Sequence, residues 1–182
     1  TATIGVDHLD EDYLRRAGIA VASAPGSNAN SVGEYVMAAL LTLGERHGLR
    51  LAGKTIGVVG VGNVGSKVAA KAAALGLRVL RNDPPLAELA GGGDYVSLDQ
   101  VQAESDIVTL HVPLTVAGRW PTRRLANGEF FRRLRPGTLF LNSSRGPVVD
   151  ESALAEAIAA GRVRAVLDVW ENEPAIDGEL VR

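Results

Sequence analysis

Residues 56–65 read Ile-Gly-Val-Val-Gly-Val-Gly-Asn-Val-Gly, and this stretch decides the fold. Ile56 to Val59 is a short apolar run typical of a buried strand, and Asn63 to Leu75 has apolar side chains at helical spacing. Between them, the pattern G-x-G-x-x-G has its glycines at 60, 62 and 65. A strand, a glycine-rich turn and a helix in this order predict a phosphate-binding turn, in which helix N-terminal N–H groups face a dinucleotide pyrophosphate.

The three glycines have separate roles in such a turn. Gly60 permits the tight turn, Gly62 lets the backbone approach a pyrophosphate, and Gly65 lets the helix pack close to the sheet. Glycines also mark plain turns, so the pattern gains its weight from its place between a strand and a helix.

An acidic residue follows the next predicted strand. Asp83 stands where a carboxylate accepts hydrogen bonds from the ribose hydroxyls of an adenosine. A carboxylate there repels a 2′-phosphate, so Asp83 predicts NAD rather than NADP, although Arg81 softens this choice. The alternative interpretation of Asp83 is a turn former before Pro84 and Pro85.

The same alternation of short apolar runs and small-residue helices continues to the end of the chain. It predicts further strands at 77–80, 107–110, 138–141 and 165–169, and helices at 98–104, 129–134 and 151–160. This rhythm indicates an α/β fold, a doubly wound parallel sheet of the Rossmann type with helices on both faces.

The first 48 residues have a different pattern. We expect a short strand at 3–5, a helix near 10–17, a turn-rich loop at 25–28 and a long apolar helix at 32–46. Ser31 and Glu34 have the spacing of a capping box at the start of that helix. We interpret the long helix as the link between two domains.

Composition narrows the classes of partner and compartment. A net charge of -2 argues against a nucleic-acid partner, and the longest apolar stretch, 35–43, is far shorter than the roughly 20 residues that span a bilayer. The absence of cysteine excludes thiolate metal sites and suits the reducing cytoplasm. We expect no metal site of another kind. No signal peptide is recognisable, and a start at Thr1 leads us to expect part of a longer polypeptide.

Polar residues follow the last three predicted strands, in the segments 111–115, 142–146 and 168–174. Since the carboxyl ends of parallel strands meet at one edge, these segments are expected to line one crevice. Arg145 is either a surface arginine or a planar fork that binds a substrate carboxylate or carbonyl. Glu173 is either a solvated acid before a proline or a group that orients a histidine and raises its pKa for proton transfer.

Five stretches, in order along nearly the whole chain, resemble the signatures of the D-2-hydroxyacid dehydrogenase family. They are 53–57, 60–65, 106–114, 142–150 and 167–174. Residues 24–29 with Glu34 resemble the family's loop and helix between its domains. The resemblance implies that residues 1–48 are the end of a substrate-domain segment plus the interdomain helix, and that 49–182 form the NAD-binding domain.

The resemblance also implies roles for individual residues. Arg145 would anchor the substrate, and Glu173 would pair with the catalytic histidine. That histidine is expected beyond Glu173, as is the returning substrate-domain segment, so we expect the 182 residues alone to be inactive. His8 and His47 fall outside the predicted crevice, and His111 is expected to be structural or to lie beside the cofactor. The implied NAD contacts are Gly60, Gly62, Asn63, Val64, Gly65, Asp83, Val112, Pro113, Ser143, Ser144, Arg145 and Asp168.

Within the family, the stretches 5–10, 83–85, 119–122, 145–150 and 167–171 are most similar to a member that oxidises a phosphorylated sugar acid on the way to pyridoxal phosphate. This implies a small phosphorylated 2-hydroxy acid as substrate, no membrane partner, and a homodimer for the full-length protein. The alternatives are another member, such as phosphoglycerate dehydrogenase, or an NAD-sensing corepressor. A methyltransferase that binds adenosyl methionine ranks lower, because its chemistry gives Arg145 and Glu173 no role.

Overall fold

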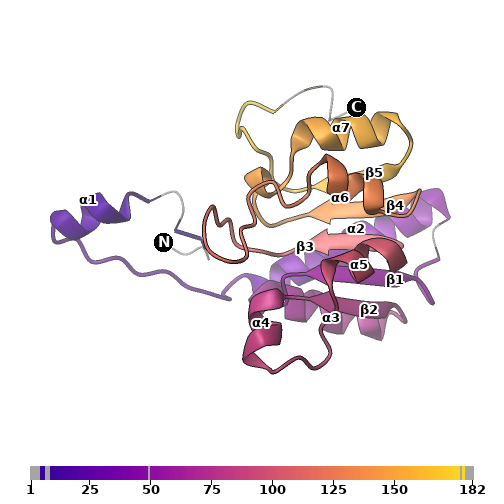
Figure 1. The fold of residues 1–182 in the computed structure, drawn as a ribbon, viewed down its shortest axis with the longest axis horizontal. Coiled ribbons are helices and arrows are strands. Elements are labelled where there is room, and N and C mark those ends of the chain that lie inside the picture. Colours follow the sequence, from indigo (N-terminus) through magenta and orange to yellow (C-terminus); the bar gives the residue numbers. More distant parts are fainter. Residues whose placement is uncertain (1–4, 7–8, 49, 177, 179–182) are drawn as a thin grey trace.

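The structure, a computed structural model of the chain, describes residues 5–6, 9–48, 50–176 and 178 (Figure 1). Its centre is a parallel sheet of five strands in the order β2-β1-β3-β4-β5. The register runs from Val59 opposite Asn82 and Leu110, to Leu110 opposite Asn142, and Asn142 opposite Leu167. The strands are β1 Thr55–Val59, β2 Arg78–Asn82, β3 Ile107–Leu110, β4 Thr138–Asn142 and β5 Val163–Leu167.

Helices cover both faces of the sheet (Figure 1). On one face, α2 (Ala29–His47) and α3 (Asn63–Ala74) pack in a core with Ile56, Val58 and Leu141. On the other face, α5 (Leu98–Glu104), α6 (Gly128–Arg133) and α7 (Glu151–Ala159) enclose a second core around Phe131 and Phe140. The predicted doubly wound α/β fold is therefore confirmed.

Side-chain caps start several helices where the sequence places polar residues. The side chain of Ser97 accepts a hydrogen bond from Gln100 N at the start of α5, and Asp150 accepts one from Ala153 N at the start of α7. Such caps satisfy N–H groups that the helix itself leaves without partners. The predicted helices at 98–104, 129–134 and 151–160 are found within one residue of their expected bounds.

The segment before α2 differs from the body of the molecule. The one helix among its described residues, α1 (Glu11–Arg16), buries none of its side chains and lies away from the sheet (Figure 1). Tyr13, Ile19 and Val21 on this arm are 56%, 50% and 44% exposed. The strand expected at 3–5 falls mostly outside the described residues, as does His8, and Gly5 is not in a strand.

Three predicted elements had wrong boundaries. The strand expected at 165–169 is β5, two residues earlier, because its pairing ends with the last residue of β4, at Asn142 opposite Leu167. The strand expected at 77–80 is β2, which starts one residue later and continues to Asn82 because its partner β1 continues to Val59. The linking helix begins at Ala29 rather than 32.

The earlier start of α2 removes the predicted capping box. Asn28 is the residue before the helix, so Ser31 lies inside its first turn. Glu34 instead accepts a hydrogen bond from Asn30 Nδ2 at 2.7 Å and lies 3.8 Å from Lys71 Nζ on α3. The helix is thus tied to α3 and shares a core with it. Across the described residues, no helix has both the length and the apolar character that crossing a membrane requires.

Candidate nucleotide and substrate site

The strand order reverses between β1 and β3, because the chain runs from β1 out to β2 and then back past β1 to β3. In open parallel sheets, ligands bind outside the carboxyl ends of the strands at such a reversal. The loops that follow all five strands meet at this edge.

The glycine turn after β1 has the shape that a pyrophosphate requires. A Cβ on Gly60 would stand 2.6 Å from the carbonyl oxygen of His111, and a Cβ on Gly65 would collide with the carbonyl oxygen of Gly60. A Cβ on Gly62, by contrast, would meet no atom within 4 Å. Two glycines are therefore required by the protein's own packing, whereas the third leaves open space at the N-terminus of α3.

Asp83 is held by two backbone N–H groups. Its Oδ2 accepts a hydrogen bond from Val61 N in the glycine turn at 2.8 Å, and its Oδ1 accepts one from Leu86 N at 3.1 Å. The second bond caps a short helix, α4 (Pro84–Leu89), so Asp83 starts a helix rather than a plain turn. The carboxylate is thus fixed beside the glycine turn, and each oxygen retains a lone pair for a ribose hydroxyl.

The ends of β3 and β4 are joined by a histidine. The ring of His111 has Nε2 2.9 Å from Thr109 Oγ1 and Nδ1 3.4 Å from Ser143 Oγ. Burial lowers the pKa of His111 to about 4, because an enclosed ring loses the hydration that favours its charged form. His111 is therefore neutral at neutral pH, and its ring connects β3 with the loop after β4.

Asn142, the last residue of β4, shapes the loop that carries Arg145. Its Oδ1 accepts hydrogen bonds from Ser144 N and Ser144 Oγ, and its Nδ2 donates to the carbonyl oxygen of Arg145. Ser144 is buried, and Arg145 is half-buried with Nη1 donating to the Ser144 carbonyl oxygen at 2.8 Å. A short 3-10 helix, Gly146–Val148, follows directly.

The loop after β5 packs against this segment. Asp168 N donates to the carbonyl oxygen of Asn142 at 3.0 Å, and Gly146 lies so close to the Trp170 carbonyl that a Cβ would collide with it. Glu173 Oε1 accepts a hydrogen bond from Trp170 N at 2.7 Å. Burial raises the pKa of Tyr35 on α2, and the negative charge of Asp168 adds to this effect.

Arg124 links the loops that follow β3, β4 and β5. Its Nη1 lies 3.6 Å from Asp150 Oδ2 and its Nη2 lies 3.7 Å from Glu171 Oε1, while its backbone N donates to the carbonyl oxygen of Pro147. Its φ of 51° lies in the left-handed region, which non-glycine residues seldom adopt. Such a conformation persists only where surrounding contacts enforce it, so the position of Arg124 is closely specified.

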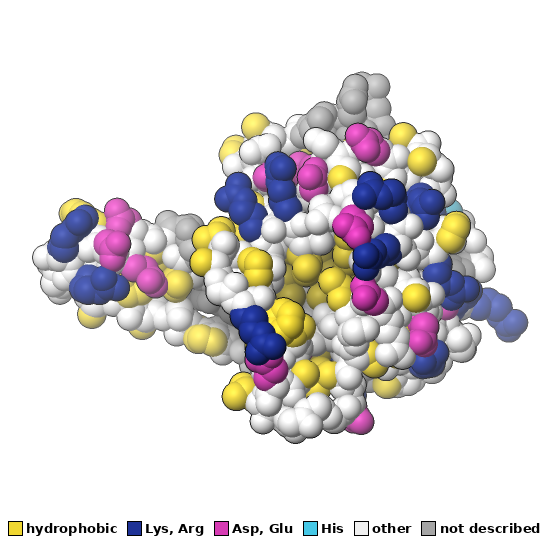
Figure 2. Space-filling view, viewed as in Figure 1, with side chains coloured by type: hydrophobic (Ala, Val, Ile, Leu, Met, Phe, Trp, Pro, Cys, Tyr) yellow, Lys and Arg dark blue, Asp and Glu magenta, His cyan; other side chains and the backbone are white. Residues whose placement is uncertain are grey.

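The predicted site residues thus lie along one edge of the sheet. Val112 covers Gly60, with its Cγ1 2.9 Å from the position of a Cβ there, while Pro113, Asp168 and Glu173 are exposed. Figure 2 shows hydrophobic side chains on the floor of a hollow in the face that α5, α6 and α7 cover. Partly buried Val96, Val112 and Leu114 belong to the core of that face.

Sequence reasoning missed three parts of the site. Helix α4 was not predicted, although an aspartate followed by a proline at the first helical position is a start signal. Asn142 was placed in the predicted crevice as part of 142–146 but was given no role, although its side chain holds the loop of Arg145. The role of Arg124 has no local signal, because its partners lie 26 and 47 residues later, at Asp150 and Glu171.

The donor set fits a dinucleotide. The open space at Gly62 faces the first turn of α3, whose N–H groups and helix dipole suit an anionic pyrophosphate. Asp83 stands beside it as an acceptor for ribose hydroxyls. Among the described residues, no group of three or more histidine, aspartate or glutamate side chains has the arrangement of a metal site.

Comparison with known proteins agrees with this geometry. Residues 29–182 match the family described as D-isomer specific 2-hydroxyacid dehydrogenase, NAD binding domain. The chain is 50% identical over 183 residues to erythronate-4-phosphate dehydrogenase of Cronobacter sakazakii and 53% identical over 186 residues to that of Salinibacter ruber. All of this chain is covered in both cases, against 48% and 47% of those proteins, so the chain spans about half the length of the curated relatives it matches.

Solved structures show the same similarity. D-lactate dehydrogenase of Aquifex aeolicus, in complex with NAD and lactic acid, superposes with a TM-score of 0.79 at 31% identity. The superposition covers 98% of this chain and 62% of that one. The sheet and its helices therefore have the arrangement found in an enzyme that binds NAD.

Proposed function

The chain belongs to the D-isomer specific 2-hydroxyacid dehydrogenase family through its NAD binding domain, and from this premise we propose that it supplies the cofactor half of an erythronate-4-phosphate dehydrogenase. The substrate is then 4-phospho-D-erythronate, and the product is its 2-oxo acid, on the way to pyridoxal phosphate. Identity of about half over the whole chain with two relatives of that name supports this substrate over 3-phosphoglycerate.

The proposed reaction is the oxidation of a secondary alcohol. NAD, when bound at the glycine turn, would supply the acceptor for the hydride that leaves C2 of the substrate. The C2 hydroxyl loses its proton to a general base, and the C–O bond becomes a carbonyl. This chain's part is to hold the reacting atoms in line and to stabilise charge at the carboxylate and the new carbonyl.

Arg145 is proposed to hold the substrate carboxylate through its planar guanidinium. One observation carries this role. The loop of Arg145 is joined through Ser143 to His111, and the His111 backbone lies directly against Gly60 in the glycine turn. A carboxylate bound at Arg145 therefore lies beside a dinucleotide bound at that turn.

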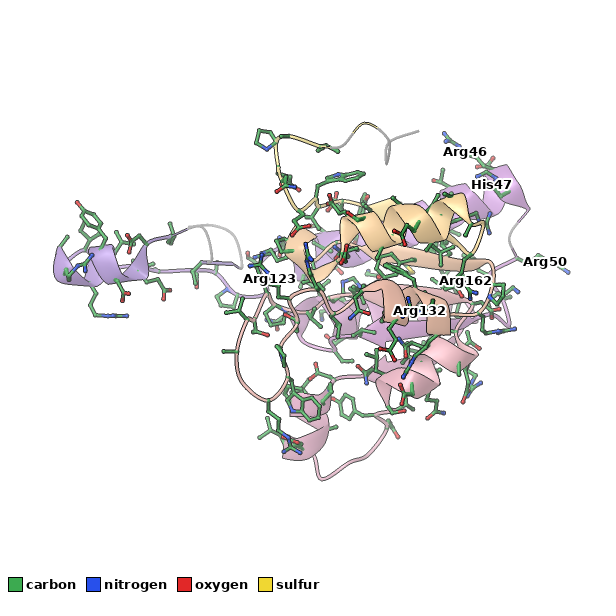
Figure 3. The ribbon with its side chains drawn as sticks, turned by 45° about the horizontal axis from the view of Figure 1, so that its top comes forward. Arg46, His47, Arg50, Arg123, Arg132 and Arg162 are labelled. Atoms are coloured by element: carbon green, nitrogen blue, oxygen red, sulfur yellow. The ribbon has the colours of Figure 1, made fainter. Side chains whose placement is uncertain are left out.

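Glu173 is proposed to pair with a catalytic histidine and to raise its pKa, so that the histidine accepts the hydroxyl proton. The exposed carboxylate of Glu173 supports this role, because it ends the β5 loop with one oxygen bonded to Trp170 N and the other not committed to that bond. His111 is unsuited to the task, since its ring is enclosed between Thr109 and Ser143. His47 lies at the far end of α2 (Figure 3).

The domain division at 48 and 49, a homodimer of the whole protein and a cytoplasmic location complete the proposal. A cysteine-free chain supports the reducing compartment. The family match begins at residue 29, and α2 shares the core of α3, so α2 is proposed as the linking helix that packs on the NAD-binding domain.

The test is NADH formation by the protein at the length of its relatives, with 4-phospho-D-erythronate and 3-phosphoglycerate side by side. Arg145→Ala should reduce kcat/KM by about 10² to 10³, as expected when a buried charge-assisted contact to substrate is lost. Arg123→Ala is the matched control, because Arg123 is exposed near the same edge (Figure 3). Preference for 3-phosphoglycerate, or equal effects of both substitutions, would contradict the proposal. The 182-residue chain alone should give no turnover.

A further inference from the structure

A second feature beside the glycine turn has no part in the function proposed above. It is a cavity of about 330 Å³ at the outer edge of the sheet, on the α3 side of β2. The segment from α4 to α5 runs past this edge (Figure 1). Eight residues line the cavity: Val61, Ser66, Arg81, Ala90, Gly92, Gly93, Asp94 and Tyr95.

The strand β2 directs one basic side chain into this cavity. Successive side chains of a strand point to opposite faces of the sheet. Leu80 belongs to the α5–α7 core, and Asn82 Nδ2 donates to Val96 on that side, so Arg81 and Asp83 point to the α3 side together. Arg81 thus lies on the same face as Asp83, two residues before this carboxylate that is expected to bind ribose.

A tight turn after α4 brings Asp94 close to Arg81. Gly91, Gly92 and Gly93 have φ values of 65°, 102° and 83°, and Val96 N then donates to the carbonyl oxygen of Arg81 at 2.8 Å. This places Asp94 Oδ2 3.6 Å from Arg81 Nη1. The pair is exposed, with 41% of the Arg81 side chain and 90% of the Asp94 side chain accessible, so it is weak and open to competition.

The cavity adjoins the proposed ribose position. Val61 lines the cavity and also donates its N–H to Asp83. A group attached to the 2′ oxygen of a ribose at Asp83 would therefore point toward Arg81 and Ser66. A phosphate there would find a guanidinium, the side chain best suited to bind its oxygens, but one already paired with Asp94.

We infer that Asp94 is a second determinant of cofactor specificity. Its ion pair with Arg81 competes with the binding of the 2′-phosphate of NADP by that arginine. This inference rests on the proposed NAD site. Discrimination against NADP is then divided between two acids. Asp83 repels the phosphate directly, and Asp94 withholds the cation that would bind it.

The test is a double-substitution cycle on the 182-residue chain, read as the Kd of NADP and of NAD by calorimetry. The background is Asp83→Ser, which lowers the direct repulsion and retains an oxygen to cap α4. In it, Asp94→Asn should tighten NADP roughly fivefold, the effect of releasing one exposed ion pair to a phosphate, and should change the Kd of NAD less than about twofold.

Two controls separate Arg81 from general charge effects. Adding Arg81→Gln should abolish the gain from Asp94→Asn, because no cation is then released. Asp99→Asn removes the same charge from α5, where Asp99 is 78% exposed and paired with Arg133, and should leave the Kd of NADP unchanged.

The inference is overturned if the gain survives Arg81→Gln, if Asp99→Asn gives the same gain, or if Asp94→Asn gives none. The unsubstituted chain distinguishes these failures from a failure of the proposed function. If the unsubstituted chain binds NAD but the effects of Asp94→Asn and Arg81→Gln on the Kd of NADP are additive, only this inference is wrong. Absence of NAD binding would instead contradict the proposed cofactor site itself.

Discussion

The two ends of the site are fixed in different ways. At the β1 and β2 end, Asp83 is bonded to the glycine turn and to α4, and Gly60 lies against the backbone of His111, so contacts between separate segments fix the groups expected to bind cofactor. At the β4 and β5 end, Asp168 N and the side chain of Arg124 hold the loops to one another, but the carboxylate of Glu173 is bonded within its own loop, to Trp170 N three residues away.

This difference indicates which property each end of the site controls. The cofactor half of the site, at β1 and β2, has its geometry set in advance by the sheet, which lowers the entropic cost of binding. The substrate half has well-placed loops, but its exposed Glu173 requires a partner group to give it a catalytic role. We therefore expect changes in the cofactor half to act on NAD binding and changes in the substrate half to act on turnover.

The largest effect should come from Gly62→Val. The position has open space in the protein, so the fold should remain, but the new side chain would fill the space proposed for the pyrophosphate. NAD affinity should fall on the order of a hundredfold or more, which is the loss of about two good charge-assisted hydrogen bonds. Calorimetry beside circular dichroism measures both properties.

Gly65→Val is the contrasting variant, because its Cβ would collide with the Gly60 carbonyl and should destabilise the fold itself. Unchanged NAD affinity in folded Gly62→Val protein would show that this turn does not hold the phosphates.

The next effect concerns His111, which joins the two halves. With a folded pKa of about 4 and an ordinary pKa near 6.5, the unfolded chain binds this proton first as the pH falls. The free energy of unfolding should therefore be unaffected above about pH 6.5, fall between pH 6.5 and 4, and show no further loss from this group below that. The loss approaches about 3 kcal/mol at most.

Urea unfolding at several pH values measures this loss, and His111→Asn isolates it from the titration of carboxylates. A variant with the same pH dependence as the unsubstituted chain would mean that the His111 ring is not enclosed as described.

A smaller effect is expected at Asp83. Asp83→Ala should weaken NAD about tenfold through the lost ribose contact, and should cost about 1 kcal/mol of folding stability through the lost cap of α4. Asp83→Ser should weaken NAD similarly and largely spare stability, because serine also caps helices. Thermal unfolding and calorimetry together separate the two roles, and equal stability losses in both variants would argue against the cap.

The smallest effect should follow Arg124→Asn. Asparagine tolerates the left-handed conformation, so this substitution removes the two ion pairs without adding strain. We expect a stability change below about 1 kcal/mol, a fall in kcat of severalfold in the protein at the length of its relatives, and an unchanged NAD Kd. Arg133→Gln, which also removes two surface ion pairs, is the matched control.

A fall in NAD affinity with Arg124→Asn would contradict the expectation that changes in the substrate half of the site act on turnover alone. An equal loss of kcat with Arg133→Gln would show that the effect is not one of loop position.

The elements found from sequence share one property, which is that local pattern determines them. The helices at 98–104 and 151–160 combine apolar periodicity with capping residues, and the glycine turn has a motif of its own, so all three were predicted closely. The ends of β2 and β5 were missed because pairing with neighbouring strands sets them. Arg124 was missed because its partners come from loops that only the folded sheet brings together.

The most direct measurement is calorimetric titration of the 182-residue chain with NAD and with NADP. The structure and the family predict saturable binding of one NAD per chain, with NADP at least about tenfold weaker because Asp83 opposes its 2′-phosphate. Absence of NAD binding by the folded chain, or NADP binding as tight as that of NAD, would contradict the claim that the glycine turn and Asp83 form an NAD site.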